Sequence, residues 1–369
     1  MNLDELRTAL TDLDGQLLEL VARRQRLSEQ VAAVKRASGR ATRDFARERD
    51  VILRGRNTAQ RLGISPDLAE ALLRRLIQSS LATQEQARVA AQAQGSGKRA
   101  LVVGGRGKMG GWFVEFLASQ GYGVAIADPA GPLAGFDYVA DWREDPLDYD
   151  VIVLATPLGI TAGLLGWLAG RRPRGLIFDL GSLKTPLRAG LNALAAAGCR
   201  VTSLHPMFGP DTVLLSGRHV IFIDLGHAGA LADAQSLFAS TMAERVVMGL
   251  DEHDRLIAYV LGLSHALNIA FFTALAESGE AAPRLANLSS TTFDAQMDVA
   301  SRVAAESPEL YYEIQSLNEY GSQSLRALRQ AVDRLVTAIE SHDQAGFTAI
   351  MDRGRAYFAA RAAARTECA

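Results

Sequence analysis

Apolar residues recur at three- and four-residue spacing through the first ninety positions of the chain. Those of the first helix-like stretch are Leu3, Leu6, Leu10, Leu13, Leu17, Leu20, Leu27, Val31 and Val34. This spacing predicts one amphipathic helix of about 30 to 35 residues, which ends at Ser38 and Gly39. Such a helix cannot bury its apolar stripe inside a small helical monomer, so we expect a second chain to pack against it.

Two shorter helices should follow within the same segment. The second is expected over residues 43–62. Ser65 and Pro66 then supply a cap and a first-turn proline for a third helix that continues to about Ala90. The sequence therefore predicts an all-α N-terminal domain over residues 1–92.

A different pattern starts after the small-residue linker 91–97. Short apolar runs typical of buried strands occupy residues 99–103, 122–127, 151–155, 176–180, 201–204 and 220–223. Helical stretches separate these runs, and such alternation predicts a doubly wound parallel sheet over 98–250. From about Asp251 onward the strand pattern stops. We expect only helices over 251–369, with a cap at Ser307–Pro308 and a break near Gly279–Pro283.

Composition and charge exclude several classes of protein. The net charge is −2, which argues against a nucleic-acid-binding surface over the whole molecule. Cys199 and Cys368 lie far apart without histidine clusters, so no disulfide scaffold or metal site is expected, and the pair suits the cytoplasm. The uncharged run 151–170 is long enough for a membrane span. Pro157 and Gly159 interrupt it, so a strand, a loop and a buried helix fit better.

A glycine motif follows the first strand of the second domain. Gly105, Gly107 and Gly110 stand between the run 101–103 and the next helix, which is the context of a dinucleotide-binding turn. Gly105 would permit the tight turn, Gly107 the approach of a pyrophosphate, and Gly110 close packing of the helix on the sheet. The pyrophosphate would lie on the helix N-terminus. With Met109, these residues are the predicted cofactor contacts.

The ends of later strands supply further candidate contacts in this Rossmann-type domain. Asp128 ends the second strand, where a carboxylate accepts hydrogen bonds from ribose hydroxyls and repels a 2′-phosphate, so we expect NAD rather than NADP. Thr156 and Pro157 follow the third strand. Ser182 follows the fourth and could orient the nicotinamide carboxamide or a substrate hydroxyl, or simply cap a helix.

His205 is the candidate base of this domain. It lies in the string Leu204-His205-Pro206-Met207-Phe208-Gly209 after a strand, and an imidazole can accept a hydroxyl proton near neutral pH. The glycine turn, the Gly181–Ser182 loop and this string, followed by a helical C-terminal domain, resemble prephenate dehydrogenase. The resemblance implies that His205 accepts the ring-hydroxyl proton while hydride moves to NAD, and that Arg302 binds a substrate carboxylate. His253 and His265 match histidines near the substrate.

The helical segment resembles the chorismate mutase domain that some members of this family carry. Such a site clamps a dicarboxylate and stabilises charge on a breaking ether oxygen, without a metal or a base. The resemblance assigns Arg7, Arg24 and Arg47 to the carboxylates, Lys35 and Gln84 to the ether oxygen, Glu48 to the substrate hydroxyl, and Asp44 and Ser80 to the polar shell. Arg7 would reach into the site of the partner chain.

The sequence is thus interpreted as a bifunctional enzyme of tyrosine biosynthesis, a homodimer with chorismate and prephenate as substrates. One alternative keeps the dehydrogenase but makes the helical domain a non-catalytic dimerisation or regulatory module. Another changes the substrate to arogenate, the amino analogue of prephenate. A third is an NAD-sensing binding protein without catalysis.

Overall fold

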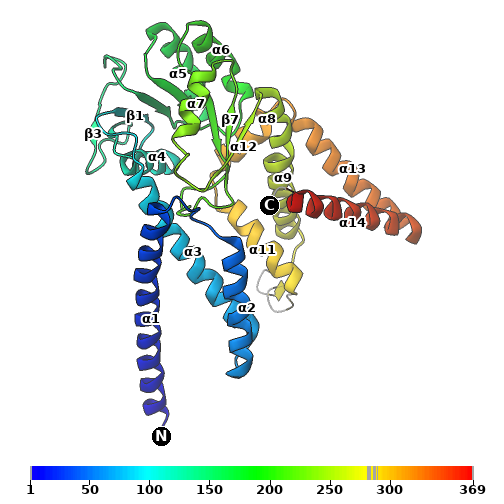
Figure 1. Cartoon of the computed structure of the whole chain (residues 1–369). Coiled ribbons are helices and arrows are strands. Elements are labelled where there is room, and N and C mark those ends of the chain that lie inside the picture. The colour runs from blue at the N-terminus through cyan, green and yellow to red at the C-terminus, as the bar shows by residue number, and fades with distance from the viewer. Residues whose placement is uncertain (1, 281–283, 286–287, 289, 368–369) are drawn as a thin grey trace. The chain divides into compact units, whose positions relative to one another are not determined.

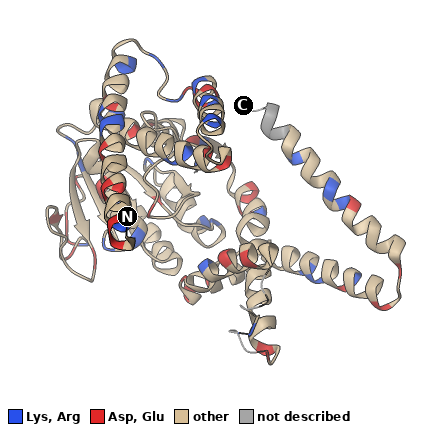
Figure 2. Ribbon diagram, turned by 90° about the horizontal axis from the view of Figure 1, so that it is seen from below, with Lys and Arg blue, Asp and Glu red and all other residues tan. Residues whose placement is uncertain are grey.

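The fold is described from a computed structural model, which describes residues 2–280, 284–285, 288 and 290–367. Cys368 and Pro283, both named in the sequence predictions, lie outside these residues. The chain divides into two compact units. Unit 1 comprises Met1–Gly181 and Ala189–Gly249, and unit 2 comprises Ser182–Arg188 and Leu250–Ala369. Each unit is described separately, and charged residues of both signs are scattered along the helices of each (Figure 2).

Unit 1 begins with three helices, α1 (Leu3–Ala37), α2 (Phe45–Arg61) and α3 (Pro66–Ala91), drawn in blue to cyan in Figure 1. Local chemistry sets their ends. Asn2 forms a capping box with Glu5, Asp44 caps α2, and Ser65 caps α3 ahead of its first-turn proline. Helix α3 packs against both α1 and α2. The predicted all-α N-terminal domain is confirmed.

Helix α1 is largely unburied in this single chain. Among its described residues only Ala32 is buried, while the predicted apolar stripe stays open, with Leu10 61% and Val34 68% exposed. Isolated helices gain most of their stability from packing an apolar face. A helix of 35 residues with such a face needs a further packing partner.

The main sheet of unit 1 is parallel and five-stranded. Its strands are β1 (Arg99–Val103), β2 (Gly123–Ala127), β3 (Asp137–Tyr138), β4 (Val151–Leu154) and β5 (Leu176–Asp179), in the order β3-β2-β1-β4-β5. Helices α4 (Lys108–Ser119), α5 (Leu158–Arg171) and α6 (Arg188–Ala196, whose first residue belongs to unit 2) follow β1, β4 and β5. The chain order reverses between β1 and β4, which places ligands at the carboxyl ends of these strands. The doubly wound prediction is confirmed here.

The last predicted strands form a separate three-stranded sheet, β6 (Ser203–Pro206), β7 (His219–Ile223) and β8 (Glu244–Met248), with α7 (Ala228–Ser236) between β7 and β8. Strand β6 runs antiparallel to β7, so parallel alternation does not extend through the whole domain. An isolated parallel β-bridge between Ile177 and Val201 links β5 to the segment that leads into β6.

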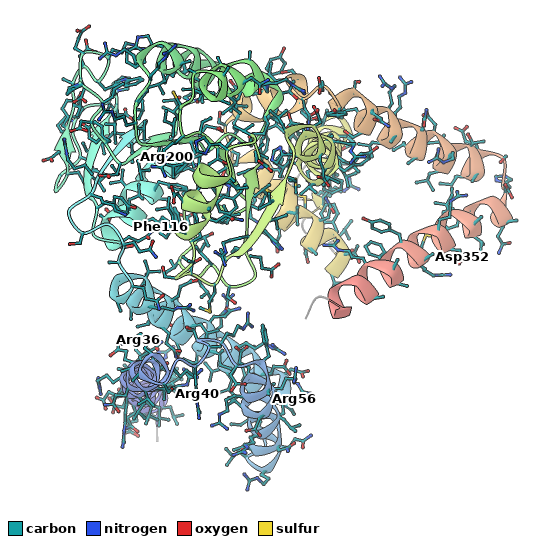
Figure 3. All side chains as sticks on the ribbon, turned by 45° about the horizontal axis from the view of Figure 1, so that its top comes forward. Arg36, Arg40, Arg56, Phe116, Arg200 and Asp352 are labelled. Atoms are coloured by element: carbon teal, nitrogen blue, oxygen red, sulfur yellow. The ribbon has the colours of Figure 1, made fainter. Side chains whose placement is uncertain are left out.

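A cluster of aromatic rings joins α4 to both sheets. Phe113 of α4 packs against Phe178 of β5, and Phe116, labelled in Figure 3, stacks on Phe238 after α7. Phe238 in turn packs against Phe222 of β7. These side chains are buried, and burial of such large apolar surfaces stabilises the arrangement. The helix that starts at the glycine turn is therefore held rigidly.

The uncharged run 151–170 and the linker 91–97 both pack into the fold. The uncharged run 151–170 forms β4 and α5, with Leu164, Leu165 and Leu168 buried, as expected for a globular core rather than a membrane span. The linker is packed against the nucleotide-binding domain at Gly95. Gly95 is buried, its N–H donates to Gln120 O at 2.9 Å, and a Cβ at this position would lie 2.2 Å from the Tyr122 ring.

Unit 2 is helical. Besides the short turn η1 (Thr185–Leu187) it contains α8 (Leu250–Ile257), η2 (Ala258–Leu263), α9 (Ser264–Glu277), α11 (Thr291–Ala304), α12 (Pro308–Ser316), α13 (Gly321–Glu340) and α14 (Gln344–Glu367). Ser307 caps α12 ahead of Pro308, as predicted. Helices α13 and α14 form a hairpin (Figure 1). One continuous described stretch, Leu250–Glu277, is long and apolar enough to cross a membrane by length and composition alone, a criterion that core helices of globular proteins also meet.

Candidate active sites

One cavity of about 270 Å³ collects most of the predicted mutase residues. Seven of the eight line it, from all three helices of the N-terminal domain: Arg24, Lys35, Asp44, Arg47, Glu48, Ser80 and Gln84. Apolar side chains complete its wall, among them Val31, Val51 and Ile77. A small cavity with a few converging polar groups on an apolar wall is the usual form of a site for a small ligand.

One end of this cavity is built around Arg24, which is predicted to bind a substrate carboxylate. Its guanidinium donates to Ser80 Oγ at 2.6 Å and to Leu76 O at 2.9 Å, which fixes it against α3. Burial lowers the pKa of Arg24 from its ordinary value. The group nevertheless stays charged near neutral pH, because an arginine pKa starts far above 7. A fixed, partly buried guanidinium is suited to a carboxylate ligand.

Lys35 and Gln84 also line the cavity, as the ether-oxygen assignment requires. Lys35 Nζ donates to Thr42 O at 2.8 Å, a contact that orients the ammonium and leaves two further N–H donors. Gln84 is 7% exposed and donates from Nε2 to Ser28 Oγ at 2.7 Å. Ser28 and Thr42 were not singled out from the sequence.

The acidic residues of the site are held from outside the cavity. Asp44 is the N-cap of α2 and accepts the Arg47 N–H at 2.9 Å. Glu48 forms a bidentate pair with Arg43, at 2.9 and 3.0 Å. The Arg47 side chain pairs with Asp50 at 2.7 Å and is 62% exposed, so it must turn from this surface pair to bind a substrate carboxylate.

A second cavity of about 540 Å³ adjoins the first and shares Lys35, Thr42 and Gln84 with it. Its other cations are Arg36, Arg40 and Arg88, and no acidic residue lines it. Figure 3 labels Arg36 and Arg40 near the end of α1. A cleft of one charge sign raises the local concentration of oppositely charged substrate.

Arg7 does not reach this cavity within its own chain. It lies on the first turns of α1, 69% exposed, with a 3.4 Å contact to Asp4. Its predicted role in the site of a partner chain stays a prediction.

The glycine turn of unit 1 has the close packing that its motif predicts, with one residue shifted. Gly104 takes the positive φ of +86° and directs the chain from β1 into the turn, so the tight turn belongs to Gly104 rather than Gly105. A Cβ on Gly110 would lie 2.0 Å from Gly104 O, and one on Gly105 would meet Ile126 at 2.8 Å. Gly107 is the N-cap of α4 and has no side chain to cap this helix, as suits a helix N-terminus that faces an anion.

Asp128 and the segment after β4 lie against this turn. Asp128 accepts hydrogen bonds from Arg106 N at 3.0 Å and Ala130 N at 2.9 Å. A Cβ on Gly104 would meet Ala155 O at 2.5 Å, and Thr156 is fixed by its contact with Thr161. Pro157 precedes α5. These residues fit a dinucleotide, because bare backbone lies beside a helix N-terminus and a carboxylate that can accept hydrogen bonds from ribose hydroxyls.

His205 lies on β6, opposite Ile221 in the register, and is 6% exposed. The parallel bridge between Ile177 and Val201 aligns the chain leading into β6 with β5. His205 therefore falls at the carboxyl edge of the strands, the edge to which the glycine turn also belongs.

In unit 2, the Ser182 loop is tied to α8 by one buried carboxylate. Asp254 accepts hydrogen bonds from Lys184 N at 2.9 Å and from Thr185 N and Oγ1 at 2.5 Å. His253 Nδ1 lies 2.6 Å from Asp254 Oδ1, and both side chains are fully buried. Burial alone would raise the pKa of Asp254, but the hydrogen bonds from His253, Thr185 and Lys184 outweigh it and lower the pKa.

The remaining predicted substrate residues lie on the helices of unit 2. His265 stacks on Tyr311 with 4.2 Å between ring centroids, and burial lowers the pKa of its imidazole. Arg302 is exposed on α11, where its Nε donates to Asp298 O at 3.0 Å. Its other donors are available to a carboxylate.

Sequence reasoning missed the residues that support these sites from outside. Ser28, Arg43 and Asp254 contact predicted site residues but belong to no motif that we recognised. A polar side chain on an otherwise apolar helix face, as at Ser28, is the one sequence signal that could have indicated such a role.

Three family models match separate segments of the chain. Residues 6–85 match chorismate mutase type II, 134–247 the nucleotide-binding domain of prephenate dehydrogenase, and 250–353 the prephenate dehydrogenase dimerization domain. The first match includes the cavity residues of the N-terminal domain. The glycine turn precedes the second match, so its role depends on the geometry described above.

Similar proteins agree with this division. The T-protein of Enterobacter agglomerans is 28% identical over 96% of this chain and 93% of its own length, and that of Haemophilus influenzae is 27% identical over 96% and 92%. The 4-amino-4-deoxyprephenate dehydrogenase of Streptomyces pristinaespiralis is 31% identical, over 68% of this chain and 88% of that protein.

Solved structures show the same fold for the dehydrogenase part. Arogenate dehydrogenase of Synechocystis has a TM-score of 0.56 at 18% identity, covering 71% of this chain and 99% of that one. Prephenate dehydrogenase of Aquifex aeolicus, in complex with hydroxyphenyl propionate and NAD+, has a TM-score of 0.56 at 17% identity, covering 71% and 97%.

The fold and the sites define an NAD-dependent dehydrogenase joined to a helical mutase. The chain belongs to the prephenate dehydrogenase family and carries a type II chorismate mutase domain in front of it, as expected for a bifunctional enzyme of tyrosine biosynthesis.

Proposed function

We propose that the helical cavity converts chorismate to prephenate and that the dehydrogenase part oxidises prephenate to 4-hydroxyphenylpyruvate. The observation that carries the mutase assignment is the gathering of seven predicted residues around one cavity of about 270 Å³. It argues against a purely structural helical domain, since a dimerisation module has no need of a cation-lined cavity with a buried amide.

The mutase reaction needs a clamp and a charge stabiliser. Arg24 and Arg47 bind the substrate carboxylates, and Arg7 of a second copy completes the set. Lys35 and Gln84 donate hydrogen bonds to the ether oxygen, where negative charge develops as its bond to carbon breaks. Glu48 accepts a hydrogen bond from the substrate hydroxyl. Ser80 holds the Arg24 guanidinium in place, and Asp44 caps the helix that carries Arg47 by accepting its backbone N–H.

In the dehydrogenase part, the turn formed by Gly105, Gly107, Met109 and Gly110 would hold the pyrophosphate of NAD at the N-terminus of α4, and Asp128 would hold its ribose. NAD bound there would supply the hydride acceptor. Thr156 and Pro157 border the cofactor, and Ser182 orients a carboxamide or a hydroxyl. His205 accepts the ring-hydroxyl proton, and Arg302 binds the substrate carboxylate. His253 and His265 are further proposed substrate residues. Loss of the ring carboxylate as carbon dioxide then restores aromaticity.

Arogenate is the second candidate substrate. The observation in its favour is the variety among similar proteins, which include an arogenate dehydrogenase and a probable arogenate/prephenate dehydrogenase. We favour prephenate because the mutase domain of the same chain makes it. The ratio of kcat/KM for the two substrates decides between them.

The active form is proposed to be a homodimer in the cytoplasm. The open leucine face of α1 supports a second copy, as does the match to a dimerization domain over 250–353. Within that match, Leu256, Tyr259 and Val260 are exposed apolar residues of the long stretch 250–277. A second copy would cover this surface and account for its hydrophobicity.

One experiment tests the mutase assignment directly. The full-length Lys35→Ala variant should lose about 100- to 1,000-fold in the rate of chorismate consumption, since it removes one donor to the developing oxyanion. Its prephenate-dependent NADH production should match the wild type. The control is Lys98→Ala, which changes an exposed lysine outside both candidate sites. An unchanged mutase rate in Lys35→Ala would contradict the assignment.

A further inference from the structure

Glu85, the residue after Gln84 on α3, is a buried carboxylate whose partners lie outside the mutase helices. It is 4% exposed. Its Oε2 accepts the Leu215 N–H at 2.7 Å, and its Oε1 accepts the Met242 N–H. Burial raises the pKa of Glu85 although these amides and Arg88 act in the opposite direction. A hidden carboxylate is costly, so the two amides are essential to this arrangement.

A second contact joins the mutase helices to the same place in the nucleotide-binding domain. Arg43 uses Nε and Nη2 to hold Glu48, and it donates from Nη1 to Ser216 Oγ at 2.6 Å. One guanidinium therefore links the proposed ligand of the substrate hydroxyl to Ser216, the neighbour of Leu215. Its planar fork fixes both partners at once.

The segment that receives both contacts comprises residues 207–218, between β6 and β7, and we call it the docking segment. Met207 N donates to His219 O at 2.9 Å at one end of it. In its middle, Trp112 Nε1 of α4 donates to Thr212 O at 3.0 Å. The segment is thus fixed within the nucleotide-binding domain by contacts that do not involve the mutase helices. It can therefore hold the mutase helices in position.

We propose that Glu85 and Arg43 are positioning residues of the mutase, through which the docking segment holds Gln84 and Glu48 in their working places. This inference rests on the proposed function of the helical cavity. Glu85 fixes α3 along its axis next to Gln84, and Arg43 fixes the carboxylate of Glu48. Catalytic groups need placement to within about 0.5 Å. Loss of either contact should therefore lower kcat more than it weakens the binding of chorismate.

The docking segment also continues the strand that carries His205. A ligand that shifts this segment from one site changes the ligand affinity of the other site. Such coupling of binding between two sites is reciprocal. The mutase is therefore built to work with the nucleotide-binding domain present.

The test changes the nucleotide-binding domain and measures the mutase, using the full-length protein. Ser216→Ala removes the hydroxyl that Arg43 contacts. It should lower the mutase kcat about three- to tenfold with little change in KM for chorismate. Ser216→Thr keeps a hydroxyl and should restore most of the rate. The matched control is Ser236→Ala on α7, whose hydroxyl bonds only Asp233 O nearby and which should behave as wild type.

Glu85→Gln is the stronger variant. The substitution places an N–H group opposite one of the two backbone N–H donors, where no hydrogen bond can form. The mutase kcat should therefore fall at least about tenfold, again with little change in KM. If this variant fails to fold, Ser216→Ala still decides. Wild-type kcat in Ser216→Ala, or an equal loss in Ser236→Ala, would overturn the proposal. A wild-type protein without chorismate turnover would instead reject the proposed function.

Discussion

Gln84 and Ser28 face each other between α3 and α1, with 2.7 Å between Nε2 and Oγ, while the buried Oε1 of Gln84 has no hydrogen-bond partner in the described part of the chain. The opposite amide orientation would let the Ser28 hydroxyl donate to Oε1 and would release both N–H groups of Nε2. The present orientation leaves one N–H of Nε2 for an ether oxygen, and the opposite orientation leaves two. Ser28 can hydrogen-bond the Gln84 amide in either orientation, because a hydroxyl both donates and accepts.

Removing this hydroxyl tests the role of Ser28. In Ser28→Ala the Gln84 amide loses its partner, and we expect the mutase kcat to fall about three- to tenfold with KM nearly unchanged. Ser79→Ala is the matched control, because Ser79 accepts a hydrogen bond from Gln25 between the same two helices but outside the cavity. Equal rates for both variants would exclude a catalytic contribution of Ser28.

The packing of the glycine turn predicts opposite outcomes for two alanine substitutions. Gly110→Ala places a methyl group 2.0 Å from Gly104 O, which displaces the turn and should raise the Kd for NAD at least about tenfold and cost about 1–3 kcal/mol of stability. Gly166→Ala on α5 meets no atom within 4 Å and should be neutral or stabilising by up to about 1 kcal/mol. NAD titration and thermal unfolding measure both. A tight-binding Gly110→Ala enzyme would refute the turn geometry.

Asp254 gives the helical unit a pH-dependent stability. Its folded pKa lies below the unfolded value of about 3.9, so its contribution is complete above that value and disappears as pH falls through the lower folded pKa. Asp254→Asn should therefore cost about 3 kcal/mol at pH 7, and the deficit should shrink in acid. Urea unfolding at pH 7 and at about pH 2, well below the unfolded pKa of Asp254, measures this. Asp251→Asn, at an exposed ion pair, should cost less than about 1 kcal/mol, and a pH-independent deficit at Asp254 would contradict the charge argument.

The proposed base predicts a pH dependence of the dehydrogenase. An imidazole accepts a proton only in its neutral form, so prephenate oxidation should slow in acid as the base becomes protonated. His205→Asn should abolish NADH production and leave chorismate consumption intact. His219→Asn is the control, since His219 is an exposed partner of Glu244 on the neighbouring strand. A flat rate profile between pH 5 and 8 would be incompatible with this role of His205.

Arg302→Ala should separate substrate binding from cofactor binding. Loss of a charge-assisted contact to a carboxylate should raise KM for prephenate about tenfold or more, with KM for NAD nearly constant. Arg329→Ala, at an exposed position on α13, serves as the comparison. Equal effects on both KM values would reject the carboxylate assignment.

Features that depend on neighbours in the chain could be predicted from the sequence. The Ser65–Pro66 and Ser307–Pro308 starts, the end of α1 at Ser38 and Gly39, and the glycine turn all follow from local backbone chemistry. The cavity residues were expected from the resemblance to chorismate mutase, because helical spacing fixes which side chains share a face of one helix but not which helices meet.

Features that depend on distant partners could not be predicted. Strand β6 has an ordinary strand pattern, and only its pairing with β7 makes it antiparallel. Glu85 looks like a solvated helix residue, yet its donors lie 130 and 157 positions away. The positive φ at Gly104 rather than Gly105 reflects how closely β4 approaches the turn, which no local motif encodes.

The packed join at Gly95 has a consequence for how the two catalysts can be separated. Because this glycine is enclosed by Tyr122 and bonded to Gln120, a protease meets folded backbone there instead of a susceptible strand of coil. Removing the mutase half at this join would expose the Tyr122 ring and take away the N–H that donates to Gln120 O.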